Sequence, residues 1–232
     1  MNFSRIAVLT SRDSWFVPYA NKLIRIFRSK GYKARIFFDH KNIGNNFPVV
    51  FILSYFKIIN KEFLKKHKHN LVVHESDLPK GRGWAPLFWQ ILEGKNKIPM
   101  VLFEANEKID EGVIYIKDFI KFYGHELHNE IRKKQAEKTI ELCLKFIDEY
   151  ENLKPKKQKG GPTFYRKRTL ADSELNINET IRKQFNLLRI VSNDQFPAFF
   201  YYKGNKYILK IYKEKNNEFI KNTQHVGIKD VK

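Results

Sequence analysis

The stretch LVVHESDLPKGRGW, residues 71–84, decides the fold of this chain. Its apolar run ends at His74, and a loop that contains proline and two glycines follows. An apolar, β-branched run that stops at a polar residue before such a loop is typical of a buried strand that ends at a crevice. In open α/β sheets ligands bind outside the carboxyl ends of the strands, so we expect His74 to face a binding site.

A second apolar run, Met100 to Phe103, precedes a polar segment that reaches Asp110, 36 residues after His74. The intervening chain has room for one helix and one strand, so we expect both side chains to meet at the same sheet edge. The alternative interpretation is a histidine that only closes its strand through hydrogen bonds, which is the commoner role.

The chain before this stretch alternates between strand and helix patterns. Ile6–Leu9 and Lys33–Phe38 read as strands on either side of an amphipathic helix at Trp15–Lys30, which ends at Gly31. This βαβ opening predicts a right-handed crossover and a parallel sheet. The first turn has no G-x-G-x-x-G, which disfavours a dinucleotide cofactor.

The remaining patterns complete an α/β prediction: a Rossmann-like, mostly parallel twisted sheet with a small carboxyl-terminal helix-plus-hairpin appendage. We expect a catalytic domain at 1–150, a linker at 151–162 that is rich in charge, proline and glycine, and a small α+β subdomain at 163–232 with a frayed tail from Glu214. The further elements expected are strands at Pro48–Ser54 and Val113–Ile116, helices at Lys61–His67, Pro86–Glu93, Glu126–Tyr150 and Ile177–Leu188, and hairpin strands at Ala198–Tyr202 and Tyr207–Tyr212.

Composition narrows the class of protein. A chain of 232 residues with 42% apolar content can bury a full core. The single Cys143 has no intramolecular disulfide partner, which suits the cytoplasm, and we expect a packed core thiol. The amino terminus reads as a first strand and not as an export signal, and no window is long and apolar enough for a membrane-spanning helix.

The formal net charge of +19 favours anionic partners such as nucleotides, phosphorylated sugars, RNA or a membrane face. The same charge fits equally well a surface on which the lysines serve only to keep the protein in solution. His67 and His69 alternate with lysines and are expected in an exposed loop. Because no partner stands at metal-ligand spacing, no metal site is expected.

The motif HESDLP, its basic glycine loop and the later IDEG resemble the N10-formyltetrahydrofolate-dependent formyltransferase superfamily, over about residues 49–118. The resemblance implies that His74 and Asp110 are catalytic. The usual motif has Asn two residues before the histidine, where this chain has Val72. Asn70, Ser76 and Asn106 are the candidate substitutes for that amide.

The resemblance also implies where the two substrates would bind. Formyltetrahydrofolate, the formyl donor, is expected at Phe56, Lys57, Ile58, Ile59, Ala105, Asn106 and Glu107. The acceptor is expected at Ser76, Lys80, Arg82, Gly83, Trp84, Tyr165, Arg166 and Arg168, with a phosphate cradle between the basic loop and the helix that begins at Pro86. A core strand, a solvated basic loop and hairpin packing are the structural alternatives for these positions.

The carboxyl-terminal segments TFYRKRT, DSELN, QFNLLR and PAFF resemble sugar-nucleotide N-formyltransferases, especially those acting on UDP-4-amino-4,6-dideoxy-N-acetyl-altrosamine in pseudaminic acid pathways. The predicted activity is therefore formyl transfer to a nucleotide-linked amino sugar, with folate as the other partner and neither DNA binding nor membrane insertion. The alternatives are a methionyl-tRNA or ribonucleotide-directed formyltransferase and an inactive RNA-binding module. Phe199, Phe200 and Tyr201 could pack within the chain or across a homodimer.

Overall fold

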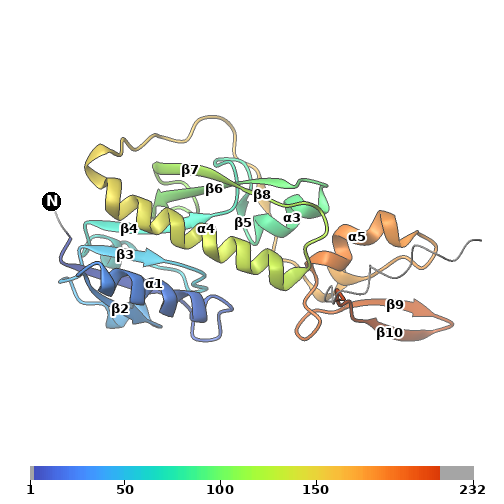
Figure 1. Ribbon diagram of the computed structural model, residues 1–232. Coiled ribbons are helices and arrows are strands. Elements are labelled where there is room, and N and C mark those ends of the chain that lie inside the picture. Colours follow the sequence, from blue (N-terminus) through green and yellow to red (C-terminus); the bar gives the residue numbers. More distant parts are fainter. Residues whose placement is uncertain (1–2, 215–232) are drawn as a thin grey trace, which may run out of the picture.

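The computed structural model describes residues 3–214, and its centre is a six-stranded sheet in the order β2-β1-β3-β4-β6-β7 (Figure 1). The first four strands of the chain are parallel: β1 (Arg5–Leu9), β2 (Lys33–Phe37), β3 (Val49–Ile52) and β4 (His69–His74). Together with its covering helices this confirms the predicted α/β class and the mostly parallel sheet.

The last two strands reverse direction. β6 (Lys97–Glu104) pairs antiparallel with β4, and β7 (Ile114–Lys121) pairs antiparallel with β6. We expected Asp110 to follow a strand that ends at the same sheet edge as His74. This expectation is wrong, because β6 runs antiparallel to β4 and ends at the other edge. Glu104, at the end of β6, lies opposite Leu71 and not opposite His74.

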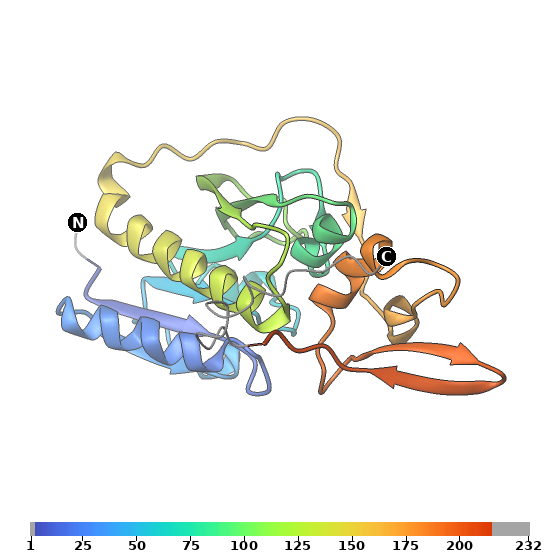
Figure 2. The same ribbon diagram turned by 45° about the vertical axis from the view of Figure 1, so that its right-hand side comes forward.

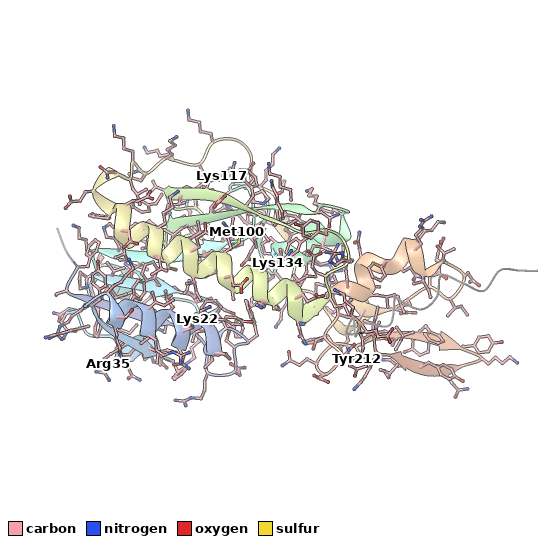
Figure 3. All side chains as sticks on the ribbon, viewed as in Figure 1. Lys22, Arg35, Met100, Lys117, Lys134 and Tyr212 are labelled. Atoms are coloured by element: carbon pink, nitrogen blue, oxygen red, sulfur yellow. The ribbon has the colours of Figure 1, made fainter. Side chains whose placement is uncertain are left out.

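Two helices cover one face of the sheet, α1 (Val17–Ser29) and α4 (His128–Glu149), as Figures 1 and 2 show. Their apolar stripes pack on side chains such as Phe51, Leu71 and Met100, which are fully buried. Figure 3 shows Met100 in the interior beneath α4, while Tyr212 lies out on the carboxyl-terminal part. Cys143, on α4, is a buried core thiol as expected.

The opposite face is covered by shorter elements. A turn of 3-10 helix, η1 (His40–Asn42), and α2 (Lys61–Leu64) pack with Phe37, Phe47 and Phe63 over the first three strands. Since Val73 packs toward α1 and α4, its neighbours Val72 and His74 point to this second face, because successive side chains of a strand alternate.

The expectation of an exposed loop at His67 and His69 is wrong. His67 is buried, with Nδ1 at 2.8 Å from the Phe47 carbonyl. His69 already belongs to β4, and its ring lies between Glu104, 3.0 Å from Nδ1, and the Tyr150 hydroxyl, 2.9 Å from Nε2. The helix before them ends at Leu64, three residues earlier than predicted, because the chain turns directly into the sheet.

The chain after α4 forms a second, smaller region. It contains η2 (Tyr150–Asn152), β8 (Phe164–Tyr165), η3 (Leu170–Ser173), α5 (Ile181–Ile190) and an antiparallel hairpin of β9 (Ala198–Tyr202) and β10 (Asn205–Leu209). The predicted helix plus hairpin is present, and residues 215–232 of the expected frayed tail lie outside the described residues. Figure 2 shows the hairpin extending away from the sheet.

A buried ion pair joins this region to the part that contains the six-stranded sheet. Arg189 of α5 is 0% exposed, and its Nη2 lies 3.1 Å from Oε2 of Glu126, which precedes α4. Burial raises the pKa of Glu126, but hydrogen bonds from Lys134 and the Tyr123 amide outweigh this and lower the pKa to about 2. Within residues 3–214, no helix has the length and apolar character needed to cross a bilayer.

Candidate active site

His74 is the last residue of β4 and lies opposite Val101 of β6. It is 6% exposed, and its Nε2 lies 2.8 Å from the carbonyl oxygen of Gly81. Because a carbonyl only accepts hydrogen bonds, Nε2 carries the proton and donates it to Gly81. This bond fixes the imidazole plane against the glycine loop and sets its tautomer.

Asp110 reaches His74 from the loop between β6 and β7. Its Oδ2 accepts a 2.9 Å hydrogen bond from the Gly83 amide and lies 3.8 Å from Nε2 of His74. Asp110 has a φ of 53°, in the left-handed region that a non-glycine residue seldom occupies. The surrounding contacts must therefore hold this backbone in place, as is typical of residues at functional sites.

The loop folds back because Gly112 can approach the end of β6 very closely. A Cβ atom at Gly112 would lie 1.5 Å from the carbonyl oxygen of Glu104. The Glu104 amide also donates to the Val113 carbonyl at 2.9 Å, which closes the turn. This reversal brings Asp110 to the face of the sheet that carries His74, although β6 runs antiparallel to β4.

Residues 153–165, which we call the strap, leave α4 and arch over β7 to reach β8 (Figures 1 and 2). Lys156 pairs with Ile114, the Thr163 hydroxyl accepts from the Gly81 amide at 2.9 Å, and β8 pairs with β5 (Arg82–Gly83). The segment predicted as a linker thus makes specific contacts with the loops that carry both candidate catalytic residues.

Gln158 makes the central contacts of the strap. Its Oε1 accepts a 2.7 Å bond from Nη2 of Arg82, and its Nε2 donates to the carbonyls of Asp110 (2.8 Å) and Gly112 (3.0 Å). This residue was not among those expected from the sequence. Its signal was weak, since one polar residue within KPKKQKGG reads as solvated linker.

The residues expected to bind the donor lie on two neighbouring loops. Ile59, Ala105 and Val72 share one apolar cluster, and Ile58 is 91% exposed beside it. Lys61 and Glu107 join the loops through an ion pair of 2.6 Å. A cluster of partly buried apolar residues beside an exposed apolar side chain is suited to contact a flat heteroaromatic ring such as a pterin.

The other donor-side candidates are partly committed to local contacts. The Phe56 amide donates to the Ser11 hydroxyl, and Lys57 pairs with Asp39 at 2.9 Å. Asn106 accepts from the Lys108 amide through its Oδ1, as in a turn that caps itself. Phe56 and Lys57 also line a shallow hollow of about 1320 Å³ that runs along the edge strand β2 and does not include His74.

The acceptor-side candidates of the basic loop separate into buried and exposed groups. Arg82 is buried and turned toward Gln158, whereas Lys80 is exposed, so Arg82 is not an open cation of a phosphate cradle. Gly83 uses its amide on Asp110. The Trp84 indole is about half exposed, with the Lys167 ammonium 5.1 Å from its ring centre.

The carboxyl-terminal candidates pack around α3 (Pro86–Leu92). Tyr165 stacks on Trp89 and its hydroxyl donates to Glu93 at 2.7 Å; burial and that carboxylate raise the pKa of Tyr165. Arg166 pairs with Asp172 and lies over the Trp89 ring. Arg168 donates to the Asp172 carbonyl, and burial lowers its pKa. These contacts order the segment that follows the strap.

The three candidates for the missing amide have different surroundings. Asn70 donates through Nδ2 to the Leu64 carbonyl and so ties β4 to the end of α2. Asn106 is exposed and accepts from its own turn through Oδ1, which leaves its Nδ2 donor outside that bond. Ser76 is buried, and its Oγ has no hydrogen-bond partner among the described residues, so it has an unused donor beside the glycine loop.

Glu75, the residue after His74, is held by two glutamines that were not expected from the sequence. Gln90 of α3 donates to the Glu75 carbonyl at 2.6 Å, and Gln135 of α4 donates to Oε1 of Glu75 at 2.6 Å. Glutamines on helical faces carry no motif that would mark them. Within the described part of the chain, no three His, Cys, Asp or Glu side chains form a metal-binding cluster.

Comparison with known proteins places this site in a family. The sequence pattern of the formyl transferase family, described as "Formyl transferase", matches residues 4–147. Methionyl-tRNA formyltransferase of Thermodesulfovibrio yellowstonii is 30% identical over 152 residues, which cover 64% of this chain and 49% of that protein. The chain thus spans about half the length of this curated relative.

Two solved structures share the fold. Methionyl-tRNA formyltransferase from Clostridium thermocellum superposes with a TM-score of 0.76 at 23% identity, covering 92% of this chain and 95% of that one. A 4-N formyltransferase from Francisella tularensis superposes with a TM-score of 0.68 at 19% identity, covering 93% and 100%. On the match that spans more than half of its length, the chain belongs to the formyl transferase family.

Proposed function

We propose that this protein transfers a formyl group from N10-formyltetrahydrofolate to the amino group of a nucleotide-linked amino-deoxy sugar. The observation that carries the proposal is the 3.8 Å approach of the Asp110 carboxylate to the His74 imidazole, in a chain that belongs to the formyl transferase family. The partly buried apolar residues Val72, Ile59 and Ala105 lie in one cluster and would contact the pterin of the donor.

The reaction needs proton transfer and the stabilisation of an oxyanion. The amine nitrogen of the acceptor attacks the formyl carbon, the carbonyl oxygen gains negative charge, and the bond to the folate nitrogen then breaks. The amine loses a proton and the departing nitrogen gains one, so the overall reaction consumes no external acid. When both of its ring nitrogens are protonated, His74 can donate through Nδ1 toward the oxyanion while Nε2 stays on Gly81, and Asp110 can orient the ring or accept a proton.

Ser76 is the residue we assign to the place of the missing amide. Val72 is apolar and cannot donate, and Asn70 already donates through Nδ2 to the Leu64 carbonyl. Asn106 is exposed on its own turn, whereas Ser76 is buried. The Ser76 hydroxyl is buried in the same loop as Gly81, with no partner among the described residues. In comparable sites one such donor to an oxyanion is worth about 3 kcal/mol.

The substrate class is supported by the carboxyl-terminal part. The segments TFYRKRT, DSELN and PAFF resemble those of sugar-nucleotide enzymes. The half-exposed Trp84 indole and the cations near it provide a surface for a nucleotide. The acceptor favoured here is a UDP-linked 4-amino-4,6-dideoxy sugar of polysaccharide biosynthesis.

A second candidate acceptor is a methionyl-tRNA or another ribonucleotide. The names of the curated relatives and the net charge of +19 favour it. A retired catalytic fold that only binds RNA is a third candidate, which Val72 in place of the usual Asn supports.

One assay separates these three functions. The purified protein is incubated with N10-formyltetrahydrofolate and, in parallel, a UDP-4-amino-4,6-dideoxy sugar, its dTDP analogue or charged methionyl-tRNA. We expect a formylated UDP-sugar detected by mass spectrometry, and no formylation by His74→Ala or Asp110→Ala although both variants fold. Transfer only to the charged tRNA would reject the sugar proposal. Salt-sensitive RNA binding without turnover would indicate the inactive module.

A further inference from the structure

We propose that Gln158 is a positioning residue that holds Asp110 in its left-handed backbone conformation beside His74. This inference rests on the proposed function, because it assigns a role toward the same pair of residues. The strap that carries Gln158 would then be part of the active site and not a spacer between two regions.

The orientation of the Gln158 amide follows from its partners. Its oxygen lies 2.7 Å from Nη2 of Arg82, which only donates, and its nitrogen lies 2.8 and 3.0 Å from two carbonyls, which only accept. A flipped amide would place an oxygen against both carbonyls and a nitrogen against the guanidinium. The network therefore admits one orientation.

Gln158 joins the two loops that supply the candidate catalytic residues. Arg82 belongs to the loop that contains Gly81, which accepts from His74, and Gly83, which donates to Asp110. Through Gln158 this loop is connected to the backbone of Asp110 and Gly112. The contacts form a closed ring, from the Asp110 carboxylate to Gly83, to Arg82, to Gln158, and back to the Asp110 carbonyl.

This closed ring of contacts restrains Asp110, whose backbone conformation is unfavourable. Asp110 has a φ of 53°, and such a conformation costs about 1–3 kcal/mol in a non-glycine residue. Gln158 binds the carbonyl of Asp110 itself and that of Gly112, so it restrains the backbone that follows the Asp110 Cα atom. Its side chain is half-buried, whereas its neighbours Lys157 and Lys159 are exposed.

The strap has other anchors, so its attachment does not depend on Gln158. Lys156 and Ile114 exchange two backbone hydrogen bonds of 2.8 Å, and Thr163 accepts from the Gly81 amide and, through its carbonyl, from the Arg82 amide. A substitution at Gln158 should therefore change the position of Asp110 and leave the strap in place.

The test variant is Gln158→Glu, which keeps the acceptor for Arg82 and removes the donor to both carbonyls. Its matched control is Gln184→Glu in α5, where Nε2 of Gln184 also donates to two carbonyls, of Asn176 and Glu179, and Oε1 accepts from the Asn176 amide. Hydrogen exchange at the Gly83 amide reports whether the Asp110 carboxylate is in place, and it requires no substrate.

We expect Gln158→Glu to exchange the Gly83 amide faster than the wild type and to lower kcat by about 100-fold, as a small displacement of a catalytic group does. KM for both substrates should stay within about threefold, because Gln158 is not among the residues assigned to either substrate. Gln184→Glu should match the wild type in kcat and in Gly83 exchange.

Wild-type Gly83 exchange together with wild-type kcat in Gln158→Glu would overturn the inference. If that variant does not fold, Gln158→Met removes the same donor without adding charge, and the same two readouts decide. A wild-type protein that formylates no amino sugar would reject the proposed function alone, since the exchange experiment still reports on the position of Asp110.

Discussion

The Gly83 amide donates a 2.9 Å hydrogen bond to Oδ2 of Asp110, and this one bond connects the loop after β4 to the loop after β6. His74 donates to the carbonyl of Gly81, which lies two residues before Gly83. The Gly83–Asp110 bond therefore also places the Asp110 carboxylate 3.8 Å from Nε2 of His74. The imidazole and the carboxylate are thus positioned by the backbone of one glycine loop.

Replacing Asp110 by Asn should separate the effect of the carboxylate charge on catalysis from the effect of its hydrogen bond on stability. The Asn side chain can still accept from the Gly83 amide, so the thermal midpoint should stay close to that of the wild type. Loss of the negative charge should lower kcat by about 100-fold or more, in line with general acid–base contributions. Steady-state kinetics with the amino-sugar acceptor measures this, with the exposed Asp194→Asn as control. A wild-type kcat in Asp110→Asn would remove the carboxylate from the mechanism.

Ser76→Ala tests the donor assigned to the oxyanion. The hydroxyl is buried without a partner among the described residues, so its removal should not destabilise the protein and relieves a desolvated group. We expect kcat to fall by about 100-fold with little change in KM. Unchanged kinetics would mean that another group, or the His74 ring alone, supports the oxyanion.

Gly112→Ala should disrupt the loop that carries Asp110. A Cβ atom there would lie 1.5 Å from the Glu104 carbonyl oxygen, a contact that no side-chain rotation can relieve. The loop must open, which should remove activity and lower the free energy of unfolding by about 2 kcal/mol or more. Gly161→Ala, where a Cβ atom meets nothing within 4 Å, is the control in urea denaturation. Equal stability of the two variants would contradict the close approach.

Glu126 should make the protein sensitive to acid. Its pKa, lowered to about 2 from 4.5, means that its contribution is present above about pH 4.5 and is lost as the pH falls toward 2. The shift corresponds to about 3 kcal/mol of stability. Urea denaturation at several pH values should show a steep decline in this window, and Glu126→Gln should be less stable at pH 7 and show a shallower decline. Parallel curves for the two proteins would assign the acid sensitivity to other carboxylates.

Cys143 should be inert in the folded protein. It is fully buried on α4, and burial raises the pKa of its thiol, so little thiolate exists near neutral pH. A thiol reagent should modify the native protein very slowly and the denatured protein rapidly, with a stoichiometry of one because the chain has one cysteine. Rapid modification of the native protein would show that α4 separates readily from the sheet.

The sequence alone predicted the class of fold and the pair His74 and Asp110, which the fold brings to 3.8 Å of each other. The apolar runs before His74 and Asp110 are local patterns, and so is the alternation of strands and helices. Such patterns can be recognised in the sequence because apolar residues are buried whatever the topology of the chain. The helix and hairpin near the carboxyl terminus were predictable for the same reason.

Only the tertiary structure decided how those residues meet. The reversal of β6 relative to β4 depends on pairing between distant strands, and the return of Asp110 depends on the absence of a Cβ atom at Gly112 against Glu104. Gln158 and the burial of His69 depend likewise on partners far along the chain. A single polar residue carries no periodic signal, because its partner is specified by the folded arrangement and not by its neighbours in sequence.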